Sequence, residues 1–82
     1  MKTRLHPHAL TRLVERGASE DEVIATVEEG EHFPAKLGRH GFRRNFEYNA
    51  QWRGRFYANK QVEAIAVEEN GWLVITVVVR LF

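Results

Sequence analysis

Apolar residues recur every three or four positions in the first part of the chain, and on alternate positions in the rest. The first spacing is typical of helices with one buried face, and the second is typical of strands. Helices followed by strands indicate the α+β class, in which helices cover one face of an antiparallel sheet. The pattern therefore predicts an N-terminal helical hairpin on a sheet of about four strands.

The two predicted helices have clear boundary signals. Residues 5–16 form the first, because Pro7 fits the first helical position, where its missing N–H is not needed, and a glycine follows the last turn. His6 is then the expected N-cap. Residues 19–30 contain the second, because Ser19 and Glu22 have the spacing of a capping box. The short connection between them predicts the hairpin.

The strands are predicted from alternation and from β-branched and aromatic content. Residues 32–40 are expected to form a loop with room for a short strand near Phe33, residues 49–51 a turn, and Asn70-Gly71 a type I′ hairpin turn. Residues 58 and 59 fit either a turn or a bulge, so 52–68 is either one bent strand or two. The predicted strands are 42–48, 52–57, 60–68 and 72–82.

The last strand has two different faces. Strict alternation places the aliphatic Leu73, Ile75, Val77, Val79 and Leu81 together, and this face suits helix packing. The other face is mixed and carries Trp72, Val74, Thr76, Val78, Arg80 and Phe82. Two helices cannot cover both faces of a four-stranded sheet, so we expect the mixed face to be open and to bind a partner.

Composition narrows the class of protein. Eighty-two residues are enough for a single domain, residues 1–82, and no residue is a cysteine. Disulfides and thiolate metal sites are therefore excluded. The sequence has no long apolar run, so we expect a soluble cytoplasmic protein without membrane contact. His6 and His8 have no evident third ligand nearby, so we expect no metal and no cofactor.

The charges are segregated, although the net charge is only +1. Residues 20–31 contain six acids and no base, whereas residues 36–60 contain seven bases and one acid. Such a basic segment is either a solvated surface or a surface for a polyanion. Because aromatic residues are interleaved, RNA is the polyanion we expect. The candidate phosphate-binding residues are Arg43, Arg44, Arg53, Arg55, Tyr57, Lys60 and Arg80.

A second group of candidates lies on the first helix. His8, Arg12 and Arg16 are spaced four apart and therefore share one broad stripe. A histidine near a helix N-terminus is favoured in its neutral form and can act as a base, and arginines can hold a phosphate. The alternative is a solvated helix edge with arginines paired to acids. Metal-independent RNA cleavage needs only such groups, because the 2′-hydroxyl is the nucleophile.

The run from His8 to Val23, with Glu29-Gly30-Glu31 and the ending Val74-Ile75-Thr76-Val77, resembles the domain-of-unknown-function family numbered 4258. That family is similar in size and element order to RelE/ParE-type toxins and to barnase-like ribonucleases. The resemblance implies a toxin-type ribonuclease, an endoribonuclease acting without metal, with catalytic positions His8, Arg12, Arg16 and Thr76. The chain differs from RelE in having no evident first strand and no C-terminal helix.

Two hypotheses follow. The first is a RelE-like toxin-type protein that binds RNA and cleaves it by acid–base chemistry. The second is a non-catalytic interaction module that pairs with an acidic antitoxin-like protein or forms a homodimer. An isologous dimer of this kind would bury Trp72 and Phe82.

Overall fold

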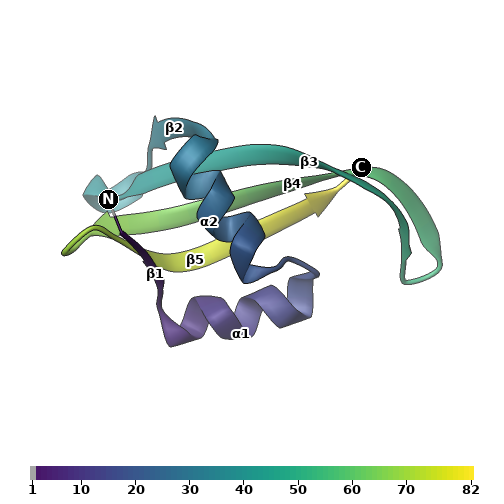
Figure 1. The fold of residues 1–82 in the computed structure, drawn as a ribbon, viewed down its shortest axis with the longest axis horizontal. Helices are drawn as coiled ribbons and strands as arrows, with labels where there is room; N and C mark the ends of the chain where they lie inside the picture. Colours follow the sequence, from purple (N-terminus) through teal and green to yellow (C-terminus); the bar gives the residue numbers. More distant parts are fainter. Residues whose placement is uncertain (1) are drawn as a thin grey trace.

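The computed structural model describes residues 2–82, which form a five-stranded sheet with two helices on one face (Figure 1). The strand order is β1-β5-β4-β3-β2; β1 is parallel to β5, and the other neighbours are antiparallel. The elements are β1 (Thr3–Leu5), α1 (Pro7–Arg16), α2 (Glu20–Glu29), β2 (Glu31–Pro34), a short 3-10 turn (Lys36–Gly38), β3 (His40–Trp52), β4 (Arg55–Glu68) and β5 (Trp72–Leu81).

The α+β class is confirmed, but a sheet of four antiparallel strands is wrong. The sheet is mixed, because β1 runs parallel to β5, with Thr3 opposite Trp72 and Leu5 opposite Val74. Strands β1 and β2 have only three and four residues. Strand β2 agrees with the short strand expected near Phe33, whereas β1 carries too few alternations to be recognised. Both form because the edges of the longer strands offer unpaired backbone groups.

The central hairpin also differs from the prediction. The predicted turn at residues 49–51 is wrong: Asn49, with φ 45°, lies at a pairing irregularity between Glu47 and Ala50 inside β3. The chain reverses instead at Arg53-Gly54, where φ is 52° and 82°. Positive φ at both positions is what a two-residue type I′ turn requires. Strand β4 is continuous, so residues 55–68 form one strand.

The second hairpin is confirmed. Asn70 and Gly71 both have positive φ, 51° and 100°, as the Asn-Gly signal predicts. The antiparallel pairing of β4 with β5 begins at Glu68 opposite Trp72, so three residues, 69–71, connect the strands instead of the two residues of a type I′ turn. The local Asn-Gly signal therefore fixed the place of the reversal but not the length of the connection.

Both helices form with the predicted caps. The His6 side chain accepts a hydrogen bond from the His8 backbone N–H at 3.0 Å, and the reciprocal bonds of the Ser19–Glu22 capping box are both present. The helices do not pack mainly against one another as a hairpin. Helix α1 follows β5, whereas α2 crosses β4 and β3 (Figure 1). Within residues 2–82, neither helix is long and apolar enough to cross a membrane.

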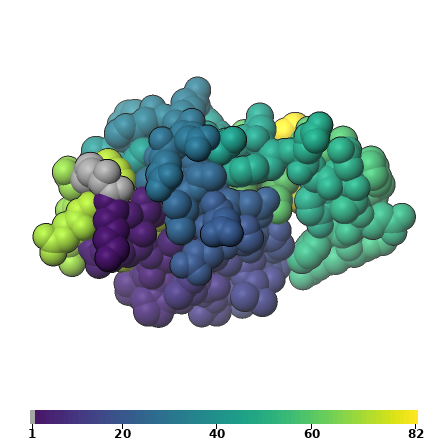
Figure 2. Space-filling view, in the orientation of Figure 1, coloured from purple at the N-terminus to yellow at the C-terminus, as the bar shows by residue number. Residues whose placement is uncertain are grey.

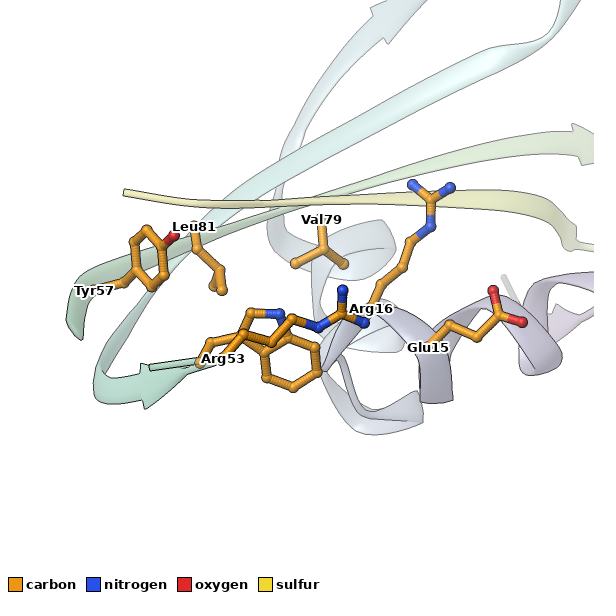
Figure 3. Close-up of a pocket in the computed structure, with 7 residues that line it drawn as sticks. Glu15, Arg16, Arg53, Tyr57, Val79 and Leu81 are labelled. Carbon is orange, nitrogen blue, oxygen red and sulfur yellow. The ribbon is translucent and has the colours of Figure 1, made fainter. Parts of the chain in front are cut away.

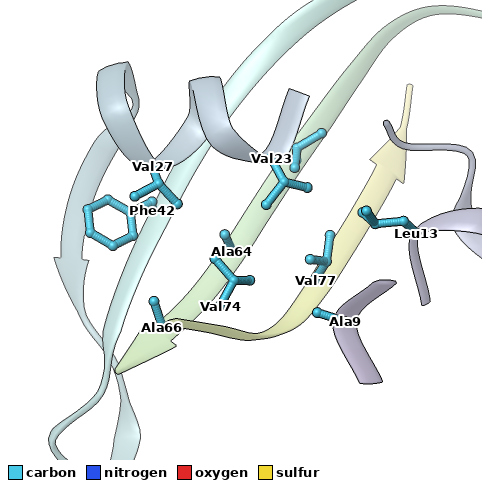
Figure 4. Packing of buried hydrophobic residues seen from close by; sticks show 10 residues of the cluster. Ala9, Leu13, Val23, Val27, Phe42, Ala64, Ala66, Val74 and Val77 are labelled. Atoms are coloured by element: carbon cyan, nitrogen blue, oxygen red, sulfur yellow. The ribbon is translucent and has the colours of Figure 1, made fainter. Parts of the chain in front are cut away.

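The core lies between the two helices and the sheet (Figure 4). Small side chains on β4 allow α2 to approach the sheet closely, because alanine leaves room for the helix side chains. Most of the buried residues are valine or alanine, as expected for strands and helices in close contact. The buried apolar residues are Ala9, Leu13, Val23, Val27, Phe42, Val62, Ala64, Ala66, Val74 and Val77.

Strand β5 contains a bulge that changes which residues face the helices. The register with β4 shifts between Ile65 and Ala66, which pair with Thr76 and Val74. Val74 and Val77 are consequently both buried, although they are three residues apart. The predicted aliphatic face is correct for residues 77, 79 and 81 and wrong before the bulge. There Trp72 and Val74 lie on the helix side, because a bulge inserts one residue out of phase.

The opposite face of the sheet carries no helix among residues 2–82. Ile65, Val67 and Leu73 are half-buried there, and Val78 is 41% exposed. Trp72 is not on this face. It packs against the core beside Phe42, with ring centroids 5.1 Å apart. The expected burial of Trp72 in a dimer through the open face is therefore wrong.

Lys60 joins the sheet to the connection between the helices. Its side chain is buried, with the residue 5% exposed, and Nζ donates hydrogen bonds to the Gly17 carbonyl at 2.9 Å and to Glu22 Oε1 at 2.8 Å. The ammonium also lies 5.1 Å from the centre of the Tyr48 ring. Lys60 is therefore not at the surface, as its place among the phosphate-binding candidates required. These partners compensate the cost of burying its charge.

We expect Lys60→Met to destabilise the fold by about 2 kcal/mol, because it leaves a half-buried Glu22 carboxylate without its cation. Lys60→Met combined with Glu22→Gln should cost less than the sum of the two single changes. Urea unfolding of the four proteins measures this coupling. Arg44→Met is the control: it breaks the more exposed Arg44–Glu29 pair, and the expected loss is below about 1 kcal/mol. Equal losses for Lys60→Met and Arg44→Met would contradict the anchoring role.

The same pair predicts a pH dependence. Burial raises the pKa of Glu22, but the hydrogen bond from Lys60 and the Ser19 contacts outweigh it and lower the pKa below its usual 4.5. This stabilisation is complete above pH 4.5 and is lost as the pH falls through the lower folded-state pKa. The thermal midpoint of unfolding should therefore fall more steeply with decreasing pH for the wild type than for Glu22→Gln. Parallel curves of thermal midpoint against pH would show that Glu22 contributes nothing to the pH dependence of stability.

Candidate nucleic-acid interface

The β3–β4 hairpin continues beyond the part of the sheet that β5 pairs with. Strand β5 pairs with β4 from Lys60 to Glu68, and Phe82 and Asn59 then exchange two backbone hydrogen bonds. Residues 48–58, which we call the arm, have no third strand beside them. Figure 2 shows the arm as the green projection at one end of the molecule.

The arm is basic and aromatic. From residue 48 to residue 62 the sequence contains no acid. The Arg53 guanidinium lies 5.5 Å from the centre of the Trp52 ring, and the Arg55 guanidinium lies 5.5 Å from that of Tyr57. Both arginines are exposed, so the cations are stacked on aromatic rings without being removed from solvent. This arrangement presents charge and flat apolar surface together.

A pocket of about 290 Å³ lies between the arm, the end of α1 and the end of β5. In Figure 3 the Arg16 side chain extends from α1 towards β5, and the Arg53 side chain extends from the arm towards α1. Arg16 and Arg53 therefore line one hollow, although they lie far apart in the sequence. The residues that line it are Glu15, Arg16, Trp52, Arg53, Tyr57, Val79 and Leu81.

Trp52 packs against Gly17 where the arm meets the helices. Gly17 has φ 74°, a conformation that favours glycine. A Cβ atom at this position would lie 3.0 Å from the Trp52 ring. Glycine is therefore needed both for the end of α1 and for the close approach of the indole. Because the Gly17 carbonyl accepts a hydrogen bond from Lys60, the end of α1 that contacts Trp52 is also joined to β4.

Much of the basic segment is neutralised by the acidic segment. Arg43 donates to Glu31, with Nε 3.1 Å from Oε1, and this bond raises the pKa of Arg43. Arg44 lies 3.2 Å from Glu29 on the helix-bearing side, and Lys60 pairs with Glu22. These three pairs join residues 20–31 to residues 36–60. Charge segregation along the sequence therefore reflects internal pairing in large part.

The predicted catalytic residues do not converge. His8 is exposed at the start of α1, about 12 Å along the helix axis from Arg16. Arg12 is half-buried between them on the same helix. Thr76 pairs with Ile65, on the sheet face opposite the helices. Only Arg16 of these four lines the pocket.

Arg80, a predicted phosphate-binding residue, also lies far from His8. Arg80 is exposed on β5 opposite Gln61, on the side away from the helices. The start of α1 lies near the start of β5, since the His6 N–H donates to the Val74 carbonyl at 2.8 Å. Arg80 is six residues further along β5, about 20 Å away. His8 and Arg80 are therefore too far apart to act on one phosphate.

Two features of the structure were missed at the sequence level, one in this site and one at the other end of the sheet. Trp52 was assigned to a strand but not to the pocket, because its contact with Gly17 depends on how the arm bends. His32 and His40 were placed in a loop, although they lie on β2 and β3. Proline and glycine within residues 34–38 were the available signal for a hairpin connection there. Among residues 2–82, no group of three or more histidine, cysteine, aspartate or glutamate side chains is placed to hold a metal ion.

The sequence matches no protein-family model and no curated protein, and the structure matches no solved structure. The function of this chain must therefore be argued from its own geometry.

Proposed function

We propose that this protein is a RelE-like, toxin-type RNA-binding protein, and that the arm and the pocket beside it are its binding surface. The observation that carries the proposal is the grouping of Arg16, Arg53, Arg55 and Tyr57, four of the predicted site residues, around one end of the molecule. Arg43, Arg44 and Lys60 are left out of this surface because acidic partners occupy them.

The chemistry of the arm suits a single-stranded polynucleotide. Arginine guanidinium groups bind phosphate oxygens by paired hydrogen bonds, and aromatic rings stack on bases. Phe56 is 59% exposed on the arm and adds a further ring. Unpaired RNA presents both phosphates and bases to a protein surface, whereas a duplex hides the base faces. The absence of acids from residues 48–62 reduces repulsion of the RNA backbone along the arm, and Glu15 is the acid that lines the pocket, on the α1 side.

We expect the double change Arg53→Ala with Arg55→Ala to reduce the salt dependence of binding to a short single-stranded RNA. Each lost phosphate contact should reduce the magnitude of the log–log slope by about 0.7, or about 1.4 for two contacts. Fluorescence anisotropy at several salt concentrations measures the slope. A same-length single-stranded DNA in parallel shows whether the 2′-hydroxyl contributes.

Lys36→Ala with Arg39→Ala is the matched control. It removes the same charge from two exposed residues that lie between β2 and β3, at the opposite end of the long strands. The slope should change little in this control. Equal changes in both double variants would indicate diffuse attraction rather than a binding surface, and a wild-type slope near zero would remove the RNA proposal.

We expect binding without cleavage in EDTA. His8, the predicted acid or base, lies at the other end of α1 from Arg16, and the pocket itself offers Glu15 and Tyr57 at opposite ends (Figure 3). Acid–base catalysis needs its groups within hydrogen-bond reach of the reacting atoms. Labelled RNA should therefore stay intact with the wild type. Cleavage that is lost in His8→Ala would reverse this conclusion and restore His8 as a catalytic residue.

A second candidate function is a protein-binding module, and the uncovered sheet face favours it. The half-buried Ile65, Val67 and Leu73 and the exposed Val78 form an apolar strip there, as expected for a surface that meets a homodimer partner or an acidic antitoxin-like protein. Phe82 is 51% exposed at the end of β5. A solution mass of two chains would support this function independently of RNA.

A further inference from the structure

Two histidines face each other across the hairpin at the opposite end of the sheet from the arm. His32 lies on β2 and His40 on β3, and their ring nitrogens, Nε2 of His32 and Nδ1 of His40, are 2.9 Å apart. Strand pairing fixes this proximity, because Phe42 is opposite His32 and His40 is opposite Pro34. The two histidines are therefore diagonal neighbours on one face of the hairpin.

Aromatic neighbours hold both rings in place. The His32 ring stacks on Phe42, with centroids 4.5 Å apart and planes 17° apart. The His40 ring lies 4.7 Å from the Trp72 ring, centroid to centroid. The backbone positions and the backing rings thus restrict both imidazoles before any ligand arrives. Preorganised ligands lose less conformational entropy on binding a metal ion than side chains on a flexible loop.

We propose that His32 and His40 form a two-histidine site for a late transition-metal ion, with Cu²⁺ or Ni²⁺ preferred. Imidazole nitrogen is a good ligand for these ions, and Cu²⁺ binds most tightly in the divalent series. The site is independent of the proposed RNA surface, and it departs from the sequence-based expectation of no metal, which rested on His6 and His8.

The nitrogen separation indicates the preferred geometry. With metal–nitrogen bonds of about 2.05 Å, two ligands at 90° are about 2.9 Å apart, and two tetrahedral ligands are about 3.3 Å apart. The observed 2.9 Å matches neighbouring positions of a square-planar or tetragonal ion. A metal ion would replace the hydrogen bond between the rings, and small rotations within the space left by the neighbouring rings would direct each lone pair to the ion. His32 is exposed and can make that adjustment.

The surroundings leave coordination positions open. A hollow of about 270 Å³ is lined by His32, Phe33, Pro34 and His40. This volume admits water molecules to the positions that the two imidazoles do not fill. The site would therefore hold an ion with exchangeable water ligands, and not a closed structural centre with four protein ligands.

Titration of the tag-free chain with Cu²⁺, followed by electron paramagnetic resonance, tests the proposal. We expect one tightly bound equivalent with two imidazole nitrogens. His32→Gln and His40→Gln should each weaken binding about 100-fold, because a single imidazole loses the advantage of simultaneous attachment. His6→Gln with His8→Gln is the control and should retain the site, although it removes the other pair of neighbouring histidines.

Circular dichroism of each variant shows that the fold is kept. As a second measurement, Ni²⁺ should raise the thermal midpoint of the wild type and not that of His32→Gln, because binding to the folded state alone stabilises it. Equal Cu²⁺ affinity in the wild type and both single variants would overturn the proposal. So would loss of the signal only in the His6 and His8 control, which would place the ion at the start of α1.

Discussion

The arrangement of the whole molecule depends on one buried cation. Lys60 lies in the middle of the sheet and reaches two groups that belong to different helices: the carbonyl that ends α1 and the carboxylate in the first turn of α2. The carbonyl end of α1 carries partial negative charge, so a cation is favourable there. Because Arg16 is the last residue of α1, the orientation that Lys60 gives the helix also sets where this arginine points.

The distribution of charge along the sequence also reflects contacts inside the folded protein. A net charge of +1 with strong segregation could describe a polyanion-binding protein, yet Glu22, Glu29 and Glu31 each pair with a base from the later segment. The Glu22 and Glu29 pairs join α2 to the sheet, and the Glu31 pair joins β2 to its neighbour β3. The arm differs because it has no acid of its own. Among residues 2–82, its two arginines form no ion pair, and this distinction supports a binding role for the arm and a structural role for the paired bases.

Sequence reasoning succeeded where structure is determined by neighbouring residues. The caps at His6 and Ser19 and the reversal at Asn70-Gly71 are local, and all three formed where they were predicted. It failed where contacts between distant segments determine the local structure. The three residues of β1 form a strand only because β5 lies beside them. The residues around Asn49 do not show by themselves whether Asn49 lies in a bulge or in a turn.

The candidate site shows the same division. The arm supplies Arg53, Arg55 and Tyr57 within five residues, so their grouping follows from the sequence. The approach of Arg16 to them depends on the packing of α1 along β5. Lys60 is chemically indistinguishable from a surface lysine, and only tertiary structure reveals that a carbonyl and a carboxylate surround it. His32 and His40 meet because a hairpin forms where a loop was expected.

The bulge in β5 determines where this strand can change length during evolution. Without Ile75, Val74 would remain opposite Ala66 and Thr76 would remain opposite Ile65, so every side chain would keep its face and the alternation would become strict. Deletion of Leu73 would instead place Trp72 opposite Val67, on the uncovered face, and would expose its indole. Among descendants of this sequence, loss of a residue from the first half of β5 should therefore be tolerated at position 75 and not at the positions before it.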